Sequence, residues 1–184
     1  MGLTGFYNQT RMRILQDCDR SFFNDVYKEL EGFLSPLSLK IGLRLIMKLD
    51  FSPLKNAITQ LEKSLKFATS PQAQSNPELF EQLRNSVIQC FEFTYELSHK
   101  MLKRYLKERS ASPDDIELGT FADLIRTGNE QKLLRSDWAC WKVYRQARTD
   151  SSHTYDEEKA IAVYQIAPEF LEEAKYLYQK LIVE

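Results

Sequence analysis

The stretch RTDSSHTYDEE, residues 148–158, brings an arginine, a histidine and a tyrosine together as Arg148, His153 and Tyr155. A guanidinium binds phosphate oxygens through paired hydrogen bonds and can stabilise charge that develops on phosphorus. A histidine with a pKa near neutrality can take or give the proton of a ribose hydroxyl. These side chains would suit cleavage of RNA without a metal ion, because its 2′-hydroxyl can serve as the internal nucleophile.

Arg148 and His153 can meet only if the helix that carries Arg148 ends between them. Five residues correspond to about 140° of rotation around a continuous helix, so the two side chains would otherwise point apart. The serine pair between them offers hydroxyls that compete with helical hydrogen bonds, and Asp156 can cap the next helix. We therefore expect a connector over residues 153–155, which, if extended, would place His153 and Tyr155 on one side.

The same residue types also have purely structural explanations. A helix C-terminus favours a cation such as Arg148 whether or not it is functional. His99 is expected to be a partly buried or surface residue of a helix, and the basic run that follows it is typical of a solvated face, although it could meet phosphate. Trp138 and Trp141 could stack on bases, but aromatic residues at helical spacing usually face the core.

The composition limits the classes of partner. The chain has 184 residues, a mass of 21.6 kDa and a formal net charge of −1. This length fits one domain with an appendage. Because there is no global basic field, we expect no DNA binding, and any contact with RNA should be local.

Cysteine and histidine usage bears on location and on metal binding. Cys18, Cys90 and Cys140 are odd in number and widely spaced, which favours buried thiols in a reducing compartment over a disulfide framework. The sequence has no apolar run long enough to cross a membrane and no signal-peptide pattern, so we expect a cytoplasmic protein. Two distant histidines and no C-x-x-C motif predict no metal site, and we expect no cofactor.

The elements that must position these residues are predicted to be helices, so the fold class is all-α. Glycine and proline are scarce at six each, and apolar residues recur with helical spacing and without sustained alternation. Serine or asparagine followed by proline marks three helix starts. We expect helices over about 52–70 and 77–109, from Ser112 to a terminating Gly128, over about 137–152, and from Asp156 onward with an interruption at Pro168; residues 70–76 should form a loop.

Residues 1–46 form a different kind of segment. A weak helical pattern is followed by an apolar stretch with interspersed basic residues, and this second stretch spans residues 33–48. Such a basic amphipathic stretch can lie on a membrane surface or dock on a partner, and it can equally pack on this protein's own helices. A third alternative is that Met47 is the real start of the protein.

Four segments together resemble the nucleotidyltransferase substrate-binding protein family, an α-helical branch of the HEPN superfamily: LDFSPLKNAITQLEKSL, VIQCFEFTYELSHKMLKRYL, SPDDIELGTFADLI and RTDSSHTYDEE. The resemblance covers residues 47–184 as one HEPN-like domain and leaves residues 1–46 as an N-terminal extension. It implies an up-and-down bundle of four to six helices that forms a homodimer. It also implies a complex with a minimal nucleotidyltransferase (MNT) encoded beside it.

The family is similar to the HEPN toxins of bacterial toxin–antitoxin modules, whose signature is R-x4-H-x-Y. Arg148, His153 and Tyr155 match this signature position for position. The resemblance implies that Arg148 and His153 are ribonuclease residues at a site assembled across the dimer. It also implies that the partner attaches AMP to Tyr155, which would put phosphate charge and bulk into the groove that receives RNA.

The chain departs from the family pattern beside the motif. Thr149 stands where the pattern favours asparagine, and its hydroxyl cannot supply the paired donor and acceptor of an amide. Asp150 could substitute in part, although an anion opposes phosphate binding, and Ser152 is a further supporting candidate. A second departure is Ser98-His99, where relatives have a small residue and tryptophan.

Three functions remain in competition. The first is a non-catalytic or regulatory subunit that presents a substrate to the nucleotidyltransferase, and Thr149 favours it. The second is a metal-independent endoribonuclease toxin that modification of Tyr155 inactivates, which the intact motif favours. The third is a membrane-surface or scaffold protein that acts through residues 33–48.

Overall fold

The computed structural model describes residues 49–153 and 155–183. Apart from Leu49, these residues belong to one compact unit, Asp50–Glu184. They form helices and no strand, so the prediction of an all-α fold is confirmed. The amphipathic stretch at 33–48, Cys18 and Met47 lie outside the described residues, and the interpretations placed on them stay predictions.

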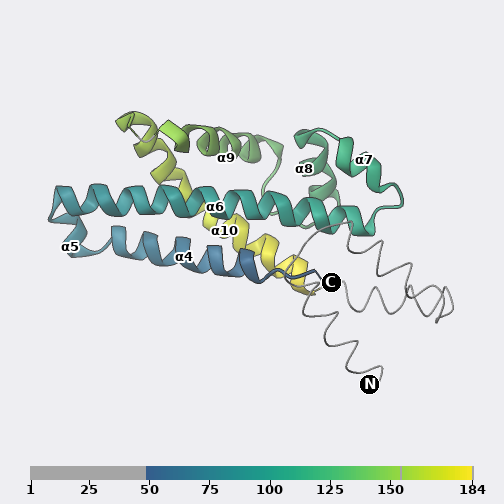
Figure 1. Cartoon of the computed structure of the whole chain (residues 1–184), viewed down its shortest axis with the longest axis horizontal. Coiled ribbons are helices and arrows are strands. Elements are labelled where there is room, and N and C mark those ends of the chain that lie inside the picture. The colour runs from purple at the N-terminus through teal and green to yellow at the C-terminus, as the bar shows by residue number, and fades with distance from the viewer. Residues whose placement is uncertain (1–48, 154, 184) are drawn as a thin grey trace, which may run out of the picture. The chain divides into compact units, whose positions relative to one another are not determined.

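The described part of the chain contains seven α-helices and one 3-10 turn (Figure 1). Four long helices build the bundle, and shorter helices and the turn complete it. In chain order they are α4 (Ser52–Ala68), α5 (Pro71–Gln74), α6 (Pro77–Arg109), α7 (Pro113–Leu118), α8 (Phe121–Glu130), α9 (Trp138–Asp150), the 3-10 turn η1 (Ser151–His153) and α10 (Glu157–Val183).

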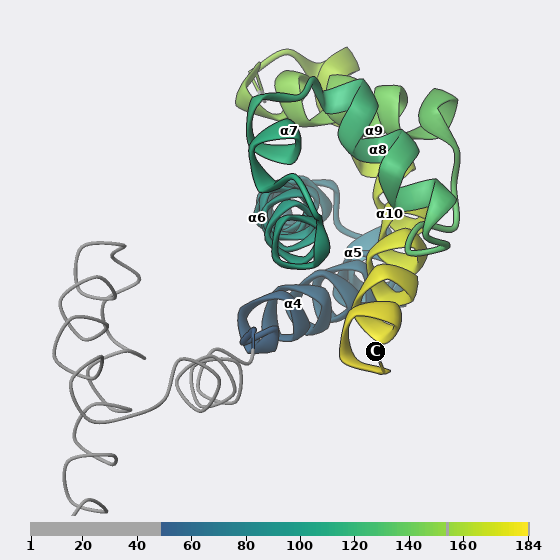
Figure 2. The same cartoon turned by 90° about the vertical axis from the view of Figure 1, so that its right-hand side faces the viewer.

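The long helix α6 is the axis of this bundle. It packs along α4 and α10, and α10 also packs on α9. Seen end-on, α4, α6 and α10 surround a common interior, which α8 and α9 close from the other side (Figure 2). Short connections follow α4 and α9, whereas α7 and α8 link α6 to α9, and the long helices together form an up-and-down arrangement.

The core is built from the faces that helical spacing predicted. The predicted α4 face is buried, and aromatic rings from three helices fill the centre of the bundle. Trp141 is fully buried, and its ring lies 6.1 Å from the ring of Phe170, which lies 5.1 Å from that of Phe91. The interpretation of Trp141 as a core residue is therefore confirmed. Cys90 and Cys140, expected to be buried, are only half-buried.

Most helix starts follow the local signals in the sequence. Asn76 accepts a hydrogen bond from the backbone N–H of Leu79, and Asp156 accepts from the N–H groups of Glu158 and Lys159. The prediction for Ser52 is wrong in detail. Ser52 is already helical, and its own N–H donates to the Asp50 carboxylate.

Three predicted boundaries are wrong. Residues 71–74 form the short helix α5 because Ser70 caps it and Ala73 packs in the core. Gly128 does not end a helix; it lies inside α8, where a Cβ would approach Leu134 Cδ1 to 3.0 Å, and the helical break occurs earlier, between α7 and α8. Pro168 does not interrupt α10; it is exposed, while Ala167 and Phe170 beside it are buried in the core and hold this part of the helix against its neighbours.

Candidate functional site

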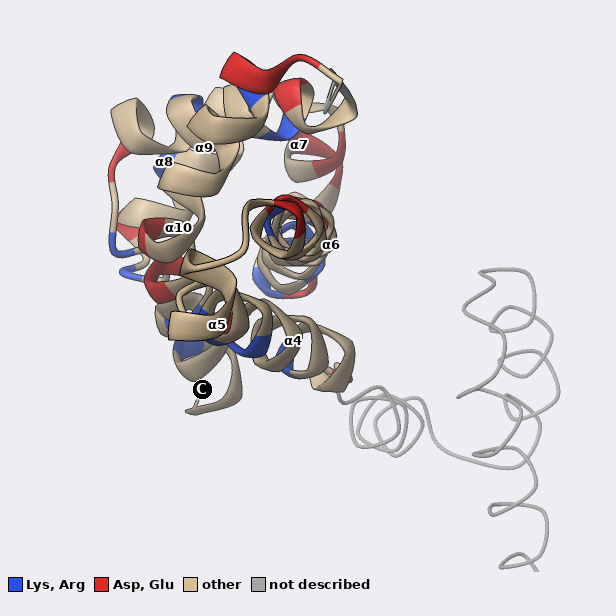
Figure 3. Ribbon diagram, turned by 90° about the vertical axis from the view of Figure 1, so that its left-hand side faces the viewer, with Lys and Arg blue, Asp and Glu red and all other residues tan. Residues whose placement is uncertain are grey.

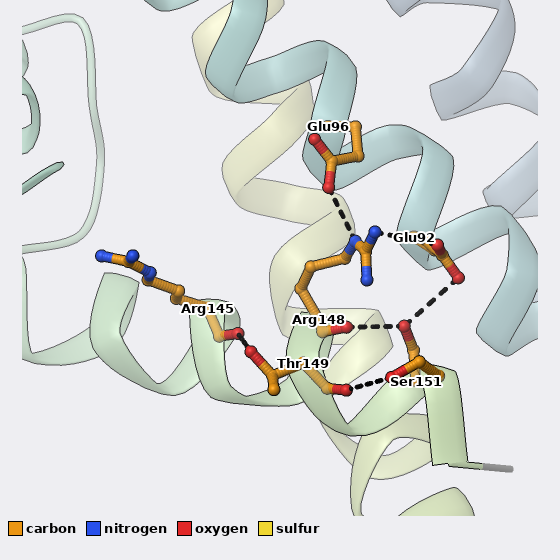
Figure 4. Close-up of polar contacts among 7 residues, drawn as sticks. Glu92, Glu96, Arg145, Arg148, Thr149 and Ser151 are labelled. Atoms are coloured by element: carbon orange, nitrogen blue, oxygen red, sulfur yellow. Dashed lines mark hydrogen bonds and ion pairs between the residues drawn. The ribbon is translucent and has the colours of Figure 1, made fainter.

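Arg148 lies in the last turn of α9 and faces α6 (Figure 4). Its Nε donates to Glu96 Oε1 at 2.7 Å, and its Nη2 lies 3.0 Å from Glu92 Oε1. Glu92 and Glu96 are four residues apart on α6, so both carboxylates lie on the same helix face. Two acidic side chains therefore hold the guanidinium that the sequence assigned to phosphate.

Ser151 joins the end of α9 to the same cluster. Its hydroxyl donates to the carbonyl oxygen of Arg148 at 2.8 Å and lies 3.3 Å from Glu92 Oε2 (Figure 4). The residue is buried. Ser151 thus links the C-terminal end of α9 to Glu92 of α6.

The side chains of the three supporting candidates, Thr149, Asp150 and Ser152, do not contact the guanidinium of Arg148. Thr149 Oγ1 donates to the carbonyl oxygen of Arg145, and Ser152 Oγ donates to the carbonyl oxygen of Thr149. Asp150 accepts from Gln146 Nε2 at 3.1 Å, and its Oδ1 lies 3.9 Å from Lys159 Nζ. These bonds stabilise the helix end and do not bring Thr149, Asp150 or Ser152 onto the guanidinium of Arg148.

His153 is the last residue of the 3-10 turn η1. An extended connector therefore does not begin at His153, and this part of the prediction is wrong. The turn forms because Ser151 and Ser152 bond to carbonyls three residues back and prolong the helical course of the chain. Because His153 is not in an extended segment, strand alternation does not place it beside Tyr155, and the pairing of Arg148 with His153 stays a prediction.

Tyr155 occupies the turn before α10 and is 85% exposed. Among the tyrosines that the structure describes, Tyr155 is the most exposed. Most of the residue is therefore accessible to another macromolecule.

A cavity of about 450 Å³ lies beside the Arg148 cluster, between α6, the α7–α8 segment and α9. Arg148 and Thr149 form one part of its wall. Its lining also includes Arg145, whose side chain extends away from the cluster of Glu92 and Glu96 (Figure 4). Glu92, Glu96 and Arg145 were not among the residues predicted from the sequence. The available signals were the four-residue spacing of the two glutamates and the position of Arg145 one turn before Arg148.

His99 lines this cavity and is half-buried, as the sequence predicted. Its ring centroid lies 5.5 Å from that of Phe121. Burial lowers the pKa of His99, and the nearby positive charges of Lys103 and Arg145 act in the same direction, whereas Glu96 opposes them. His99 is consequently neutral at pH 7, with one ring nitrogen able to donate a hydrogen bond and the other able to accept one.

Charges of both signs occur along α6 (Figure 3). Lys107 Nζ lies 2.6 Å from Glu117 Oε2, and Lys103 Nζ lies 3.3 Å from the other oxygen of that carboxylate. The basic run after His99 is therefore partly neutralised by α7. Within residues 49–153 and 155–183, no helix has the length and apolarity to cross a membrane, and no three potential metal-ligand side chains cluster.

The helical bundle, with α6 at its axis and the R-x4-H-x-Y segment between α9 and α10, has the fold of a nucleotidyltransferase substrate-binding domain. The family model described as "Nucleotidyltransferase substrate binding protein like" matches residues 49–183. This chain belongs to that family. The resemblance noted in the sequence is thereby confirmed.

Two similar proteins come from Haemophilus influenzae. A curated protein named "Probable ribonuclease HepT" is 45% identical over 94 residues, which span 51% of this chain and 64% of that protein. The solved structure of HI0074, described as the fold of a substrate-binding domain of a nucleotidyltransferase, is 35% identical with a TM-score of 0.63. That match covers 72% of this chain and 98% of HI0074.

Proposed function

We propose that this chain is the helical partner subunit of a minimal nucleotidyltransferase and that it receives a nucleotide on Tyr155. The observation that carries the proposal is the 85% exposure of Tyr155 in the turn before α10. An acceptor tyrosine must enter the active site of another protein, so it has to project from its own fold. Membership of a family named for nucleotidyltransferase substrate binding supports the same assignment.

The transfer would proceed on the α-phosphorus of a nucleoside triphosphate. Tyr155 Oη attacks this phosphorus, the bond to the bridging oxygen breaks, and pyrophosphate leaves. The phenolic proton passes to a base of the partner enzyme. The product is a phosphodiester between Tyr155 and the nucleoside, which adds one negative charge and considerable bulk beside the end of α9.

The state of Arg148 supports a regulatory subunit over a catalytic one. Glu96 binds Nε and Glu92 binds Nη2, so the Nε–Nη2 side of its guanidinium is occupied. A phosphate that bound this side would have to displace a carboxylate, and both negative charges oppose an anion nearby. Thr149 bonds back to Arg145 and does not orient a substrate at Arg148.

The second candidate is a metal-independent endoribonuclease, acting as a homodimer. The relative named "Probable ribonuclease HepT" and the position of Arg148 on the wall of a cavity favour it. The ribose 2′-oxygen would attack the adjacent phosphorus, the bond to the 5′-oxygen would break, and His153 would take the 2′-hydroxyl proton. Arg148 would stabilise the charge on phosphorus, and Glu92 and Glu96 would have to release it first.

Nucleotide transfer tests the first candidate. The purified chain is incubated with the nucleotidyltransferase encoded beside it, Mg²⁺ and ATP, and its intact mass is measured. We expect the wild type to gain the mass of AMP and Tyr155→Phe to gain none. Tyr178→Phe, a half-buried tyrosine on α10, is the matched control and should be labelled like the wild type.

Labelling that persists in Tyr155→Phe would move the acceptor to another residue. Absence of labelling in every variant, despite an active enzyme, would remove the acceptor role altogether. Co-purification of the two chains is the accompanying readout, because a partner subunit should bind the enzyme even when Tyr155 is replaced.

A further inference from the structure

The cavity between α6, the α7–α8 segment and α9 combines an aromatic surface with positive charge. It is walled in part by His99 and Phe121 and also by Arg145, Arg148 and Lys103, with Glu96 as its carboxylate. Its volume of about 450 Å³ lies within the range of small-molecule sites, roughly 300–1,000 Å³. No step of the proposed nucleotide transfer to Tyr155 uses this cavity.

Arg145 is the cation of this cavity that is best placed to bind a ligand. Arg148 is held by Glu92 and Glu96, and Lys103 by Glu117. Arg145, by contrast, forms no ion pair with the described residues, and its guanidinium carbon lies 4.7 Å from the centre of the Phe121 ring. A guanidinium stacked on a ring keeps its N–H groups directed outward in its plane, where they can bind a phosphate.

Phe121 is the central ring of the aromatic surface that lines the cavity. His99 and Trp138 lie 5.5 and 5.6 Å from its ring, centroid to centroid. Phe121 is only half-buried, so part of this surface faces the cavity. A nucleobase can stack on such a surface, whatever its sequence identity.

His99 and Glu96 add polar groups to the lining of the cavity. Burial lowers the pKa of His99, so the neutral ring offers a donor and an acceptor to a base edge. Arg148, 2.7 Å from Glu96, offsets part of its negative charge, although the same guanidinium also pairs with Glu92. The carboxylate that lines the cavity therefore opposes an anionic ligand less than an unpaired carboxylate would.

We propose that this cavity binds a nucleoside monophosphate, with the base on the Phe121–His99 surface and the phosphate on Arg145. A purely apolar ligand would leave the guanidinium without an anion, and inorganic phosphate would leave the aromatic surface uncovered. Only a ligand that carries both a flat ring and a phosphate uses all three side chains. The binding is non-covalent and independent of Tyr155.

Isothermal titration of the full chain with AMP, adenosine and inorganic phosphate tests this assignment. AMP should bind more tightly than either fragment. Arg145→Gln should weaken AMP binding at least about tenfold, because it removes charge-assisted hydrogen bonds to phosphate. The matched control Lys142→Gln removes an exposed charge from the same helix outside the cavity and should bind AMP like the wild type.

Phe121→Leu should weaken AMP binding while leaving the weaker phosphate binding unchanged. Circular dichroism verifies that each variant is folded, and Arg145→Gln remains informative if Phe121→Leu is not, because Arg145 is exposed. Titration of Tyr155→Phe separates this cavity from the acceptor tyrosine, and its AMP affinity should equal that of the wild type. The assignment is overturned by absent AMP binding, by equal affinities for AMP and phosphate, by equal affinities of Arg145→Gln and Lys142→Gln, or by loss of binding in Tyr155→Phe.

Discussion

Arg148 and Arg145 are one helical turn apart on α9, yet their surroundings differ. Arg148 is half-buried against two carboxylates of α6. Arg145 lies over an aromatic ring at the cavity. The arginine of the R-x4-H-x-Y motif is therefore the one whose charge is already balanced, and the arginine outside the motif is available to an anion.

His99 should make stability depend on pH. Its pKa in the folded protein is lowered from 6.5, mainly by burial. As pH falls through 6.5, the unfolded chain takes up a proton that the folded chain refuses, so stability decreases until the folded-state pKa is passed. We expect the melting temperature of His99→Gln to fall less than that of the wild type between about pH 7.5 and about pH 5.5.

The exposed neighbour Lys100 provides the control for this measurement, since Lys100→Gln changes a charge without removing a buried imidazole. It should keep the pH dependence of the wild type. If His99→Gln and the wild type lose stability in parallel, burial of a neutral His99 is not the cause.

At the scale of elements, Glu173 of α10 holds the segment that leads into α9. It is 1% exposed, and its two carboxylate oxygens accept the backbone N–H groups of Arg135 and Ser136 at 3.0 and 2.9 Å. Asp137, the next residue, then caps α9 through the N–H of Cys140. One buried carboxylate thus sets where α9 begins and, through that helix, where both arginines lie.

Replacing Glu173 with alanine should lower the free energy of unfolding by about 2–4 kcal/mol, because two part-buried N–H groups lose charge-assisted bonds. Glu172→Ala is the matched control, since Glu172 is exposed and contacts Lys175 at the surface; it should cost less than about 1 kcal/mol. Urea denaturation measures both values. Equal effects of the two substitutions would contradict a special role of Glu173.

At the scale of the whole molecule, the two candidate functions differ in the chain that would bind the bundle: a second copy of this chain or a nucleotidyltransferase. A net charge of −1 provides no general attraction for RNA. In the ribonuclease candidate, a homodimer would bring two copies of Arg148 and His153 together. In the subunit candidate, a partner enzyme would cover Tyr155, and the ion pairs of Arg148 with Glu92 and Glu96 would not need to break.

Expression without the nucleotidyltransferase distinguishes these states. A bacterial host carrying the full chain should grow normally if the chain is only a subunit and should lose RNA integrity if it is a ribonuclease. In the second case Arg148→Ala and His153→Ala should both restore growth, and Lys142→Gln should not. Growth arrest that survives both substitutions, with the proteins folded and expressed, would contradict ribonuclease action by this motif.

Features of the fold that depend on neighbouring residues could be predicted from the sequence. The bounds of α6 and the caps Asn76 and Asp156 were recognised because proline geometry and side-chain capping act within a few residues. The buried Trp141 followed from helical spacing. The family was recognisable because four segments of the sequence carry its pattern in unbroken order, the last of them with the contiguous R-x4-H-x-Y motif.

Other features were decided by residues far apart in the chain. Pro168 stays inside α10, and Gly128 inside α8, because packing against other helices outweighs a local helix-ending signal. Arg148 meets Glu96 across 52 positions of sequence, and Arg145 meets Phe121 from a different helix. The sequence alone therefore determined the long helices and the motif. Only the tertiary structure decided which arginine is paired with carboxylates and which residues line the cavity, because these features depend on how distant helices pack.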